Sequence, residues 1–208
     1  MSKSKTDELV FLPLGGSNEI GMNLNAYGFG PANDRKWILV DVGVTFGDHS
    51  TPGVDVIVPD PTFLEGENIL GIVLTHAHED HIGALGWLWP RLKAPLYATP
   101  FTAYLIREKL RDAGIGDRVK LHEVPLGGTI DLDPFHIEMV TITHSTAEPN
   151  GLAITTPLGL VLHTGDWKID NAPVVGERTG EDRREENVLR LALGSSSLGD
   201  RVLGGSAA

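Results

Sequence analysis

The residues most able to do chemistry are those of the motif HAHEDH at positions 76–81. The motif places His76, His78, Asp80 and His81 directly after the apolar run 69–74, which is predicted to be a buried strand. Imidazole and carboxylate groups are the ligands that zinc takes in catalytic sites, where one position stays open for water. The motif therefore predicts a metal site at the point where a strand ends and a helix begins.

The spacing within the motif predicts two adjacent metals. His76 and His78 are two residues apart, so in an extended chain their side chains point to the same side. Asp80 and His81 follow where the chain turns into a helix, and we expect that they do not easily share the pocket of the first pair. We therefore assign His76 and His78 to one metal, and Asp80 and His81 to the other.

Two further ligands are predicted at later strand ends. His144 follows the predicted strand 135–143, and it can complete the first site. Asp166 follows the predicted strand 160–164, and its two carboxylate oxygens can bridge both metals. Asp80 and Asp166 are the predicted catalytic residues, because they hold and orient a metal-activated water.

Several other polar residues are weaker candidates for contact with the site or its substrate. Asp41 ends the predicted strand 36–42, and it either orients a ligand imidazole or simply forms a turn. His163 either supports Asp166 or faces the core, and Ser145 directly follows His144. Glu19 and Asn23 belong to the motif GGSNEIGMN, where they either shape the loop or reach the site.

The elements that position these residues are mostly predicted strands. In the first half, strands are expected at 8–14, 22–29, 36–42, 69–74 and 95–98, and helices at 80–92 and 100–113, with Pro90 disturbing the last turn of the first helix. Residues 46–61 show little periodicity. In the second half, strands are expected at 119–124, 129–132, 135–143, 152–156 and 160–164. Residues 187–193 are expected to form about two turns of helix.

Composition sets the class of protein. The 208 residues include 41% apolar residues, enough for one domain with a core. The excess of 28 acidic over 17 basic residues gives a net charge of −11, which argues against a general nucleic-acid coat but leaves room for a local basic groove. There is no cysteine, so a metal must be held by histidine and carboxylate. There is neither a signal-like start nor an apolar run of about 20 residues, and we expect a cytoplasmic protein without a membrane partner.

The ligand pattern HxHxDH, together with His144 and Asp166, resembles the metallo-β-lactamase superfamily. This resemblance implies an α/β fold, the αββα sandwich with metals at one edge. The motifs GGSNEIGMN, Pro59-Asp60, Thr143-His144-Ser145 and HTGDWKID, spread over residues 8–175, are similar to the ribonuclease J family of β-CASP nucleases. That closer resemblance implies a hydrolase of RNA phosphodiesters that acts as a 5′ exonuclease and endonuclease. It also implies two Zn²⁺ ions, with Mn²⁺ as an alternative, and homo-oligomers or RNA-decay partners for the complete protein.

The sequence departs from this family toward its end. A family member would continue into a β-CASP domain after the Asp166 region and would later supply another histidine to the second metal. Here the resemblance stops near residue 176. We therefore expect residues 8–175 to form a metallo-β-lactamase domain that is incomplete at its C-terminal side. Residues 176–208 would be a poorly ordered tail from truncation or a frameshift, and the chain alone would have little activity.

The cluster of basic residues has two possible roles, and two other functions compete with RNA hydrolysis. The main cluster of basic residues comprises Arg91, Lys93, Arg107, Lys109 and Arg111. We expect it to be a solvent-exposed helix face and not an RNA-binding surface. A small-molecule hydrolase of the same superfamily, of the thioesterase or lactonase type, is a second reading that GGSNEIGMN and HTGDWKID disfavour. A non-catalytic fragment that binds metal or a partner is the third.

Overall fold

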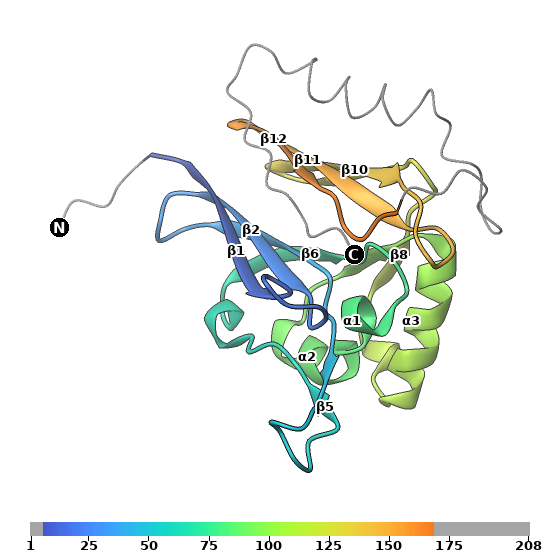
Figure 1. Ribbon diagram of the computed structural model, residues 1–208. Helices are drawn as coiled ribbons and strands as arrows, with labels where there is room; N and C mark the ends of the chain where they lie inside the picture. Colours follow the sequence, from blue (N-terminus) through green and yellow to red (C-terminus); the bar gives the residue numbers. More distant parts are fainter. Residues whose placement is uncertain (1–5, 169–208) are drawn as a thin grey trace. The chain divides into compact units, whose positions relative to one another are not determined.

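The structure is a computed structural model that describes residues 6–168 of the chain (Figure 1). The chain divides into two compact units, Met1–Glu123 and Val124–Ala208. The predicted tail 176–208 and the predicted helix 187–193 lie outside the described residues, so both stay predictions. Within the described part of the chain, no helix is long and apolar enough to cross a membrane.

The first unit contains a six-stranded sheet with the strand order β1-β2-β3-β6-β7-β8. Neighbouring strands run antiparallel from β1 to β3 and parallel from β3 to β8. The strands are β1 (Glu8–Gly15), β2 (Leu24–Gly30), β3 (Lys36–Val40), β6 (Asn68–Val73), β7 (Leu96–Ala98) and β8 (Leu121–Glu123). The carboxyl ends of the parallel strands share one edge of the sheet, and the HAHEDH motif follows β6 at that edge.

Three helices lie on one side of this sheet: α1 (Glu79–Ile82), α2 (Leu85–Leu92) and α3 (Pro100–Asp112) (Figure 1). Alternate strand residues pack on them because side chains in a strand point to opposite faces in turn. The shared core includes Trp37, Leu39, Ile72, Leu88, Ile106 and Leu110. Short 3-10 helices lie at Thr62–Leu64, before β6, and at Gly116–Arg118, after α3.

The predicted helix 80–92 is divided into α1 and α2 at Gly83 and Ala84. The cause is a long-range backbone contact. Ala84 N–H donates to Val42 O (2.9 Å) instead of continuing the helix, and Val42 N–H donates to His81 O (2.7 Å). Pro90 lies inside α2, which nevertheless continues to Leu92, so the expected disturbance does not end the helix early.

A small hairpin occupies part of the segment that shows no periodicity. β4 (Thr45–Phe46) pairs with β5 (Val56–Ile57), and Gly47 N–H donates to Asp55 O at 3.2 Å. Strands of two residues are too short to display a repeat of two, so the sequence pattern does not reveal them.

The second unit contains a four-stranded antiparallel sheet in the order β12-β11-β10-β9. The strands are β9 (Thr129–Leu132), β10 (Phe135–Thr141), β11 (Asn150–Thr156) and β12 (Gly159–His163). Phe135, Ile137 and Met139 alternate along β10 and are buried, whereas His136 between them is exposed. The polar loops that follow β10 and β12 carry the predicted ligands of this unit.

Candidate metal centre

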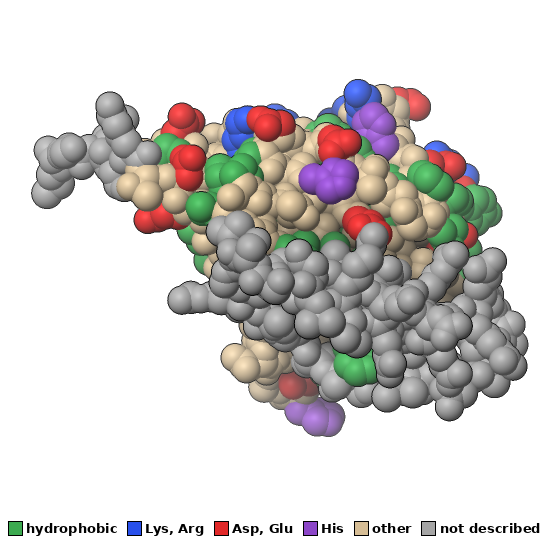
Figure 2. All heavy atoms as spheres, turned by 90° about the horizontal axis from the view of Figure 1, so that it is seen from above, with side chains coloured by type: hydrophobic (Ala, Val, Ile, Leu, Met, Phe, Trp, Pro, Cys, Tyr) green, Lys and Arg blue, Asp and Glu red, His purple; other side chains and the backbone are tan. Residues whose placement is uncertain are grey.

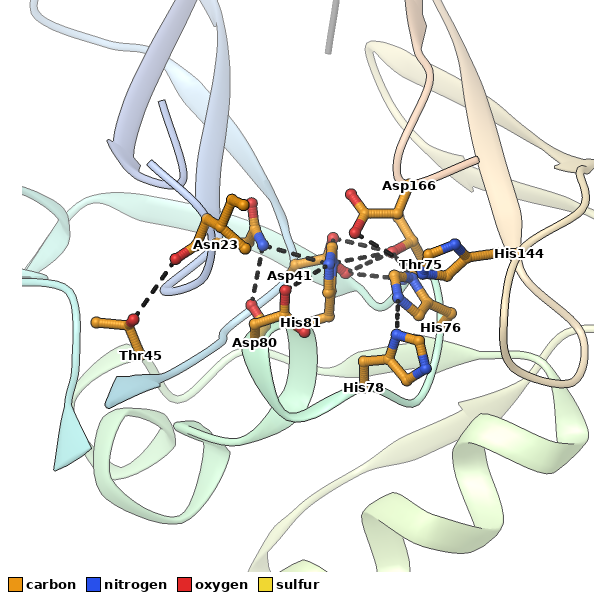
Figure 3. Close-up of polar contacts among 11 residues, drawn as sticks. Asn23, Asp41, Thr45, Thr75, His76, His78, Asp80, His81, His144 and Asp166 are labelled. Carbon is orange, nitrogen blue, oxygen red and sulfur yellow. Dashed lines mark hydrogen bonds and ion pairs between the residues drawn. The ribbon is translucent and has the colours of Figure 1, made fainter. Parts of the chain in front are cut away.

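The first unit brings three histidine side chains together at the start of α1 (Figure 3). The rings of His76 and His81 have their centroids 3.9 Å apart, and His76 Nε2 lies 3.1 Å from His78 Nδ1. His76 is fully buried and His81 is 2% exposed. Nitrogen atoms this close offer several lone pairs to one small volume, which is the arrangement that a metal ion requires.

Asp80 adds a carboxylate to the same cluster. Its Oδ2 atom lies 3.5 Å from Nε2 of His81, and its side chain is 27% exposed. The sequence predicts that Asp80 and His81 do not easily share the pocket of His76 and His78. The structure instead places the His76 ring against both other histidines, because α1 begins at Glu79 and turns the chain back at once.

The main chain of α1 is held by segments that are distant in sequence. The carbonyls of Glu79, Asp80 and His81 accept hydrogen bonds from the N–H groups of Val44 (3.1 Å), Asn23 (3.0 Å) and Val42 (2.7 Å). A helix of four residues has too few internal hydrogen bonds to be stable alone. The outside donors therefore fix the turn that carries the cluster.

Gly43 allows this close approach. A Cβ atom at this position would lie 1.5 Å from Asp80 O, so no other residue fits without moving α1. The sequence Val42-Gly43-Val44 therefore has a direct steric reason, and it lies opposite the three carbonyls of α1.

Asp41 is fully buried and lies behind His81 (Figure 3). Its Oδ2 atom is 2.8 Å from His81 Nδ1, and Oδ1 accepts from the Thr75 N–H at 2.8 Å. The backbone φ of Asp41 is 64°, a left-handed turn that aspartate tolerates better than most residues. Asp41 therefore both turns the chain and contacts the His81 ring.

The contact with Asp41 has an electronic consequence for His81. A carboxylate acceptor on Nδ1 favours the tautomer that carries its hydrogen there and leaves the Nε2 lone pair available to a metal. The buried carboxylate also acts on its surroundings. The pKa of Tyr27 is raised above its usual range, first by burial and then by the negative charge of Asp41.

Thr75 also belongs to the hydrogen-bond network of the histidine cluster, a role that the sequence alone does not predict. Its hydroxyl lies 2.9 Å from Asp41 Oδ2 and 3.0 Å from His76 Nδ1. Thr75 is fully buried, and it links the carboxylate behind His81 to the ring of His76. Its position directly before the motif is the only sequence signal that could have indicated this.

The two candidates from the GGSNEIGMN loop behave differently. Asn23 Nδ2 donates to Asp80 O at 3.1 Å and lies 3.2 Å from His81 Nε2, so Asn23 belongs to the cluster. Glu19 is exposed, and its carboxylate accepts from Gly16 N–H at 3.2 Å within the same loop. Glu19 therefore shapes the loop.

The second unit brings its own two predicted ligands together. His144 Nε2 lies 3.8 Å from Asp166 Oδ2, with side-chain exposures of 13% and 30%. The loops that carry them are joined because Lys168 N–H donates to Thr143 O at 2.7 Å. Ser145 is exposed beside His144, and His163 is the last residue of β12, half-buried and paired in register with Leu152.

Comparison with known proteins gives this pattern a family. Residues 36–182 match the model of the beta-lactamase superfamily domain, so the match continues past residue 176, where we expected the resemblance to stop. The chain belongs to the beta-lactamase superfamily. It is similar to a Ribonuclease J from Sinorhizobium meliloti, with 47% identity over 93% of this chain and 36% of that protein. It is also similar to a Ribonuclease J from Synechocystis sp., with 40% identity over 84% of this chain and 27% of that protein.

Solved structures agree on the fold of this superfamily. A protein of unknown function from Enterococcus faecalis aligns with this chain at a TM-score of 0.59 and 20% identity. The alignment covers 77% of this chain and 44% of that protein. A metallo-beta-lactamase fold protein from Bacillus subtilis aligns at a TM-score of 0.53 and 18% identity. This alignment covers 77% of this chain and 63% of that protein. The predicted α/β metallo-β-lactamase fold is therefore confirmed.

The side chains of this superfamily member fit a divalent metal. In the first unit, three imidazoles and one carboxylate converge, and the chain has no thiolate to compete with them. Nitrogen and oxygen donors suit zinc, and they also accept manganese. The buried acceptor Asp41 behind a candidate ligand is the outer support that metal-bound histidines generally have.

The basic residues of the helices are engaged with acidic partners. Arg107 Nη1 lies 2.6 Å from Glu123 Oε1, and Lys109 Nζ lies 2.6 Å from Glu79 Oε1. Arg91 pairs with Glu65. Lys and Arg side chains on the visible face lie beside Asp or Glu in several places (Figure 2). These pairings agree with the predicted solvated helix face and give no support to an RNA track.

Proposed function

We propose that this chain carries the metal-binding part of a ribonuclease J-type hydrolase of RNA phosphodiesters. The observation that carries the proposal is the cluster of His76, His78, Asp80 and His81 with Asp41 behind it. The similarity to Ribonuclease J at 47% identity supports RNA as the substrate class. The chain spans 36% and 27% of the two curated relatives named above, so the activity proposed is that of a longer protein.

We assign the ligands to two Zn²⁺ ions, with Mn²⁺ as an alternative. His76, His78 and His144 would hold one ion. Asp80, His81 and Asp166 would hold the other, with Asp166 bridging the two. The first-unit cluster offers four side-chain ligands, too few for two metals, and the His144–Asp166 pair would add one imidazole and one carboxylate. This joining of two ligand groups is the central claim of the proposal.

The protein groups then have distinct roles in hydrolysis. When bound, the metals lower the pKa of a water toward neutrality and neutralise charge on the phosphate oxygens. Asp80, which is partly exposed, orients the attacking water. Asp41 and Thr75 keep the His76 and His81 rings in place. Ser145 and His163 are proposed to lie close to the substrate side of the site.

The biological setting belongs to the same proposal. We infer 5′-exonucleolytic and endonucleolytic action in RNA maturation and decay, in the cytoplasm, with homo-oligomers or RNA-decay partners of the longer protein. Residues 8–175 are proposed as the incomplete metallo-β-lactamase domain. The 208-residue chain alone is expected to show little cleavage.

Zinc content and RNA cleavage measured on one purified sample test this function. We expect the chain to bind zinc, and His76→Ala to lose that zinc together with any trace of cleavage of a 5′-monophosphorylated RNA. His136→Ala is the matched control, because His136 is an exposed histidine on β10 that pairs with Asp131. Thioester and lactone substrates are assayed in parallel. Turnover of either above that of RNA, or unchanged zinc in His76→Ala, would contradict the proposal.

A further inference from the structure

The backbone of Asn23 is fixed between two segments of the first unit. Its N–H donates to Asp80 O at 3.0 Å, and its C=O accepts from Gly43 N–H at 2.8 Å. Asn23 ends the loop 16–23, which connects β1 to β2. These two contacts do not involve the side chain, so a substitution that keeps the backbone N–H leaves them available.

The side chain of Asn23 makes a separate set of contacts (Figure 3). One amide nitrogen, which carries two hydrogens, reaches Asp80 O at 3.1 Å and His81 Nε2 at 3.2 Å. Because Asp41 accepts a hydrogen bond from Nδ1 of the same ring, Nε2 is the nitrogen that carries the lone pair. Asn23 therefore contacts the same atom that would bind the metal.

Gly16 leaves room for the other end of this amide. The Asn23 Oδ1 atom lies over Gly16, where a Cβ would come within 2.2 Å of it. Gly16 has a φ of +83°, which a residue with a side chain rarely adopts. The glycine thus leaves room for Oδ1 and leaves Nδ2 directed at α1.

We propose that Asn23 is a positioning residue that holds Asp80 and His81 in ligand geometry before the metal binds. The inference rests on the proposed metal centre. The hydrogen bond to His81 Nε2 keeps the ring from turning away and is weak enough for a metal to replace. The hydrogen bond to Asp80 O persists and continues to hold the turn. A residue beyond the ligands that supports them in this way typically changes metal affinity about 10–100-fold when it is removed.

The test compares Asn23→Ala, Asn23→Asp and Asn33→Ala in the 208-residue chain. Asn33 is an exposed asparagine in the turn after β2, so Asn33→Ala is the same chemical change away from the cluster. Zinc affinity is measured by competition with a chromophoric chelator. Hydrogen exchange of residues 79–84 is measured without metal.

Asn23→Ala should weaken binding of the zinc assigned to Asp80 and His81 about tenfold and should speed exchange in α1, whereas Asn33→Ala should do neither. Asn23→Asp places an acceptor where a donor is needed, so exchange in the metal-free chain should also become faster. Its zinc affinity, however, should return to at least the wild-type value, because a carboxylate beside Nε2 is itself a zinc ligand. A residue that only stabilised the fold would make the two variants lose zinc together.

Zinc affinity of Asn23→Ala equal to that of the wild type, or a parallel loss in both variants, overturns the positioning role. Absence of RNA cleavage in the wild type counts against the proposed function alone, since neither readout depends on RNA. If the wild type binds no zinc, the proposed centre and the positioning role of Asn23 both fail, whatever the exchange rates are.

Discussion

The carboxylate of Asp41 lies 2.8 Å from Nδ1 of His81, although 40 positions separate them in the sequence. Both side chains are almost completely buried, with exposures of 1% and 2%. A buried carboxylate is stable only when hydrogen-bond donors surround it. Here Thr75 supplies two donors and His81 a third, so the carboxylate orients the ring and is itself satisfied.

Asp41→Asn should weaken zinc binding about 10–100-fold, because the amide is a poorer acceptor for the His81 ring and can present a donor to it. Asparagine tolerates the same left-handed backbone, so the turn itself should persist. Zinc competition titration measures the effect. Asp48→Asn in the exposed loop 47–55 is the control and should bind zinc as the wild type does. Equal affinity in both variants would show that Asp41 does not support the ligand.

Thr75→Val should lower the free energy of unfolding by about 1–3 kcal/mol, because it removes a buried donor to Asp41 while keeping the side-chain shape. Urea unfolding followed by circular dichroism measures this change, and Thr75→Ser should recover most of it. Thr62→Val, at an exposed threonine that bonds Asp60, should change stability by less than about 0.5 kcal/mol. The hydroxyl would have no structural role if the two valine variants were equally stable.

Gly43→Ala should disturb both folding and metal binding, because the added Cβ meets Asp80 O. Overpacking of this kind costs about 1–3 kcal/mol, and here it also moves α1 away from its donors. Thermal unfolding and zinc content are the measurements. Gly116→Ala is the matched control, since its nearest contacts at 3.7 Å leave ordinary room. A stable, zinc-binding Gly43→Ala would rule out the close approach seen between this segment and α1.

Tyr27 should make the first unit sensitive to alkaline pH. Its pKa is raised in the folded chain by burial and by the charge of Asp41, so the unfolded chain loses this proton first, at about pH 10. The contribution of protonated Tyr27 to the free energy of unfolding is thus fully present below about pH 10. It is lost as the pH rises toward the folded-state pKa of Tyr27. Urea midpoints at a series of alkaline pH values check this. In Tyr27→Phe the decline above pH ~10 should be shallower, and an identical slope would contradict the assignment.

Local patterns account for the elements that the sequence predicts well. α3 begins at Pro100 and ends at Asp112, close to the predicted range, because proline at its start and Gly114 after its end are strong local signals. β9 is found at its predicted bounds, and β12 is shifted by one residue, because turn residues flank both. The predicted resemblance to the metallo-β-lactamase superfamily is confirmed by the match to its model. This resemblance is readable because the spacing of ligands in HxHxDH is also a local property of the sequence.

Long-range contacts account for what the sequence does not reveal. The break between α1 and α2 depends on Val42 and Ala84, which no local window contains together. The same holds for Asn23 against Asp80, 57 positions apart. Thr75 carries no distinguishing signal beyond its place before the motif. The pairing of His76 with His81 follows from how tightly α1 turns, a detail that spacing alone leaves open.

The outside donors of α1 link metal binding to folding. The turn that presents Asp80 and His81 exists only while residues 23 and 42–44 are in place, so an unfolded chain has no preformed site. A ligand that binds only the folded state stabilises it by RT ln(1 + [L]/Kd), which is about 2.7 kcal/mol at a hundredfold excess over Kd. Zinc bound to α1 would therefore be expected to raise the unfolding midpoint of the whole first unit, including strands that touch no ligand.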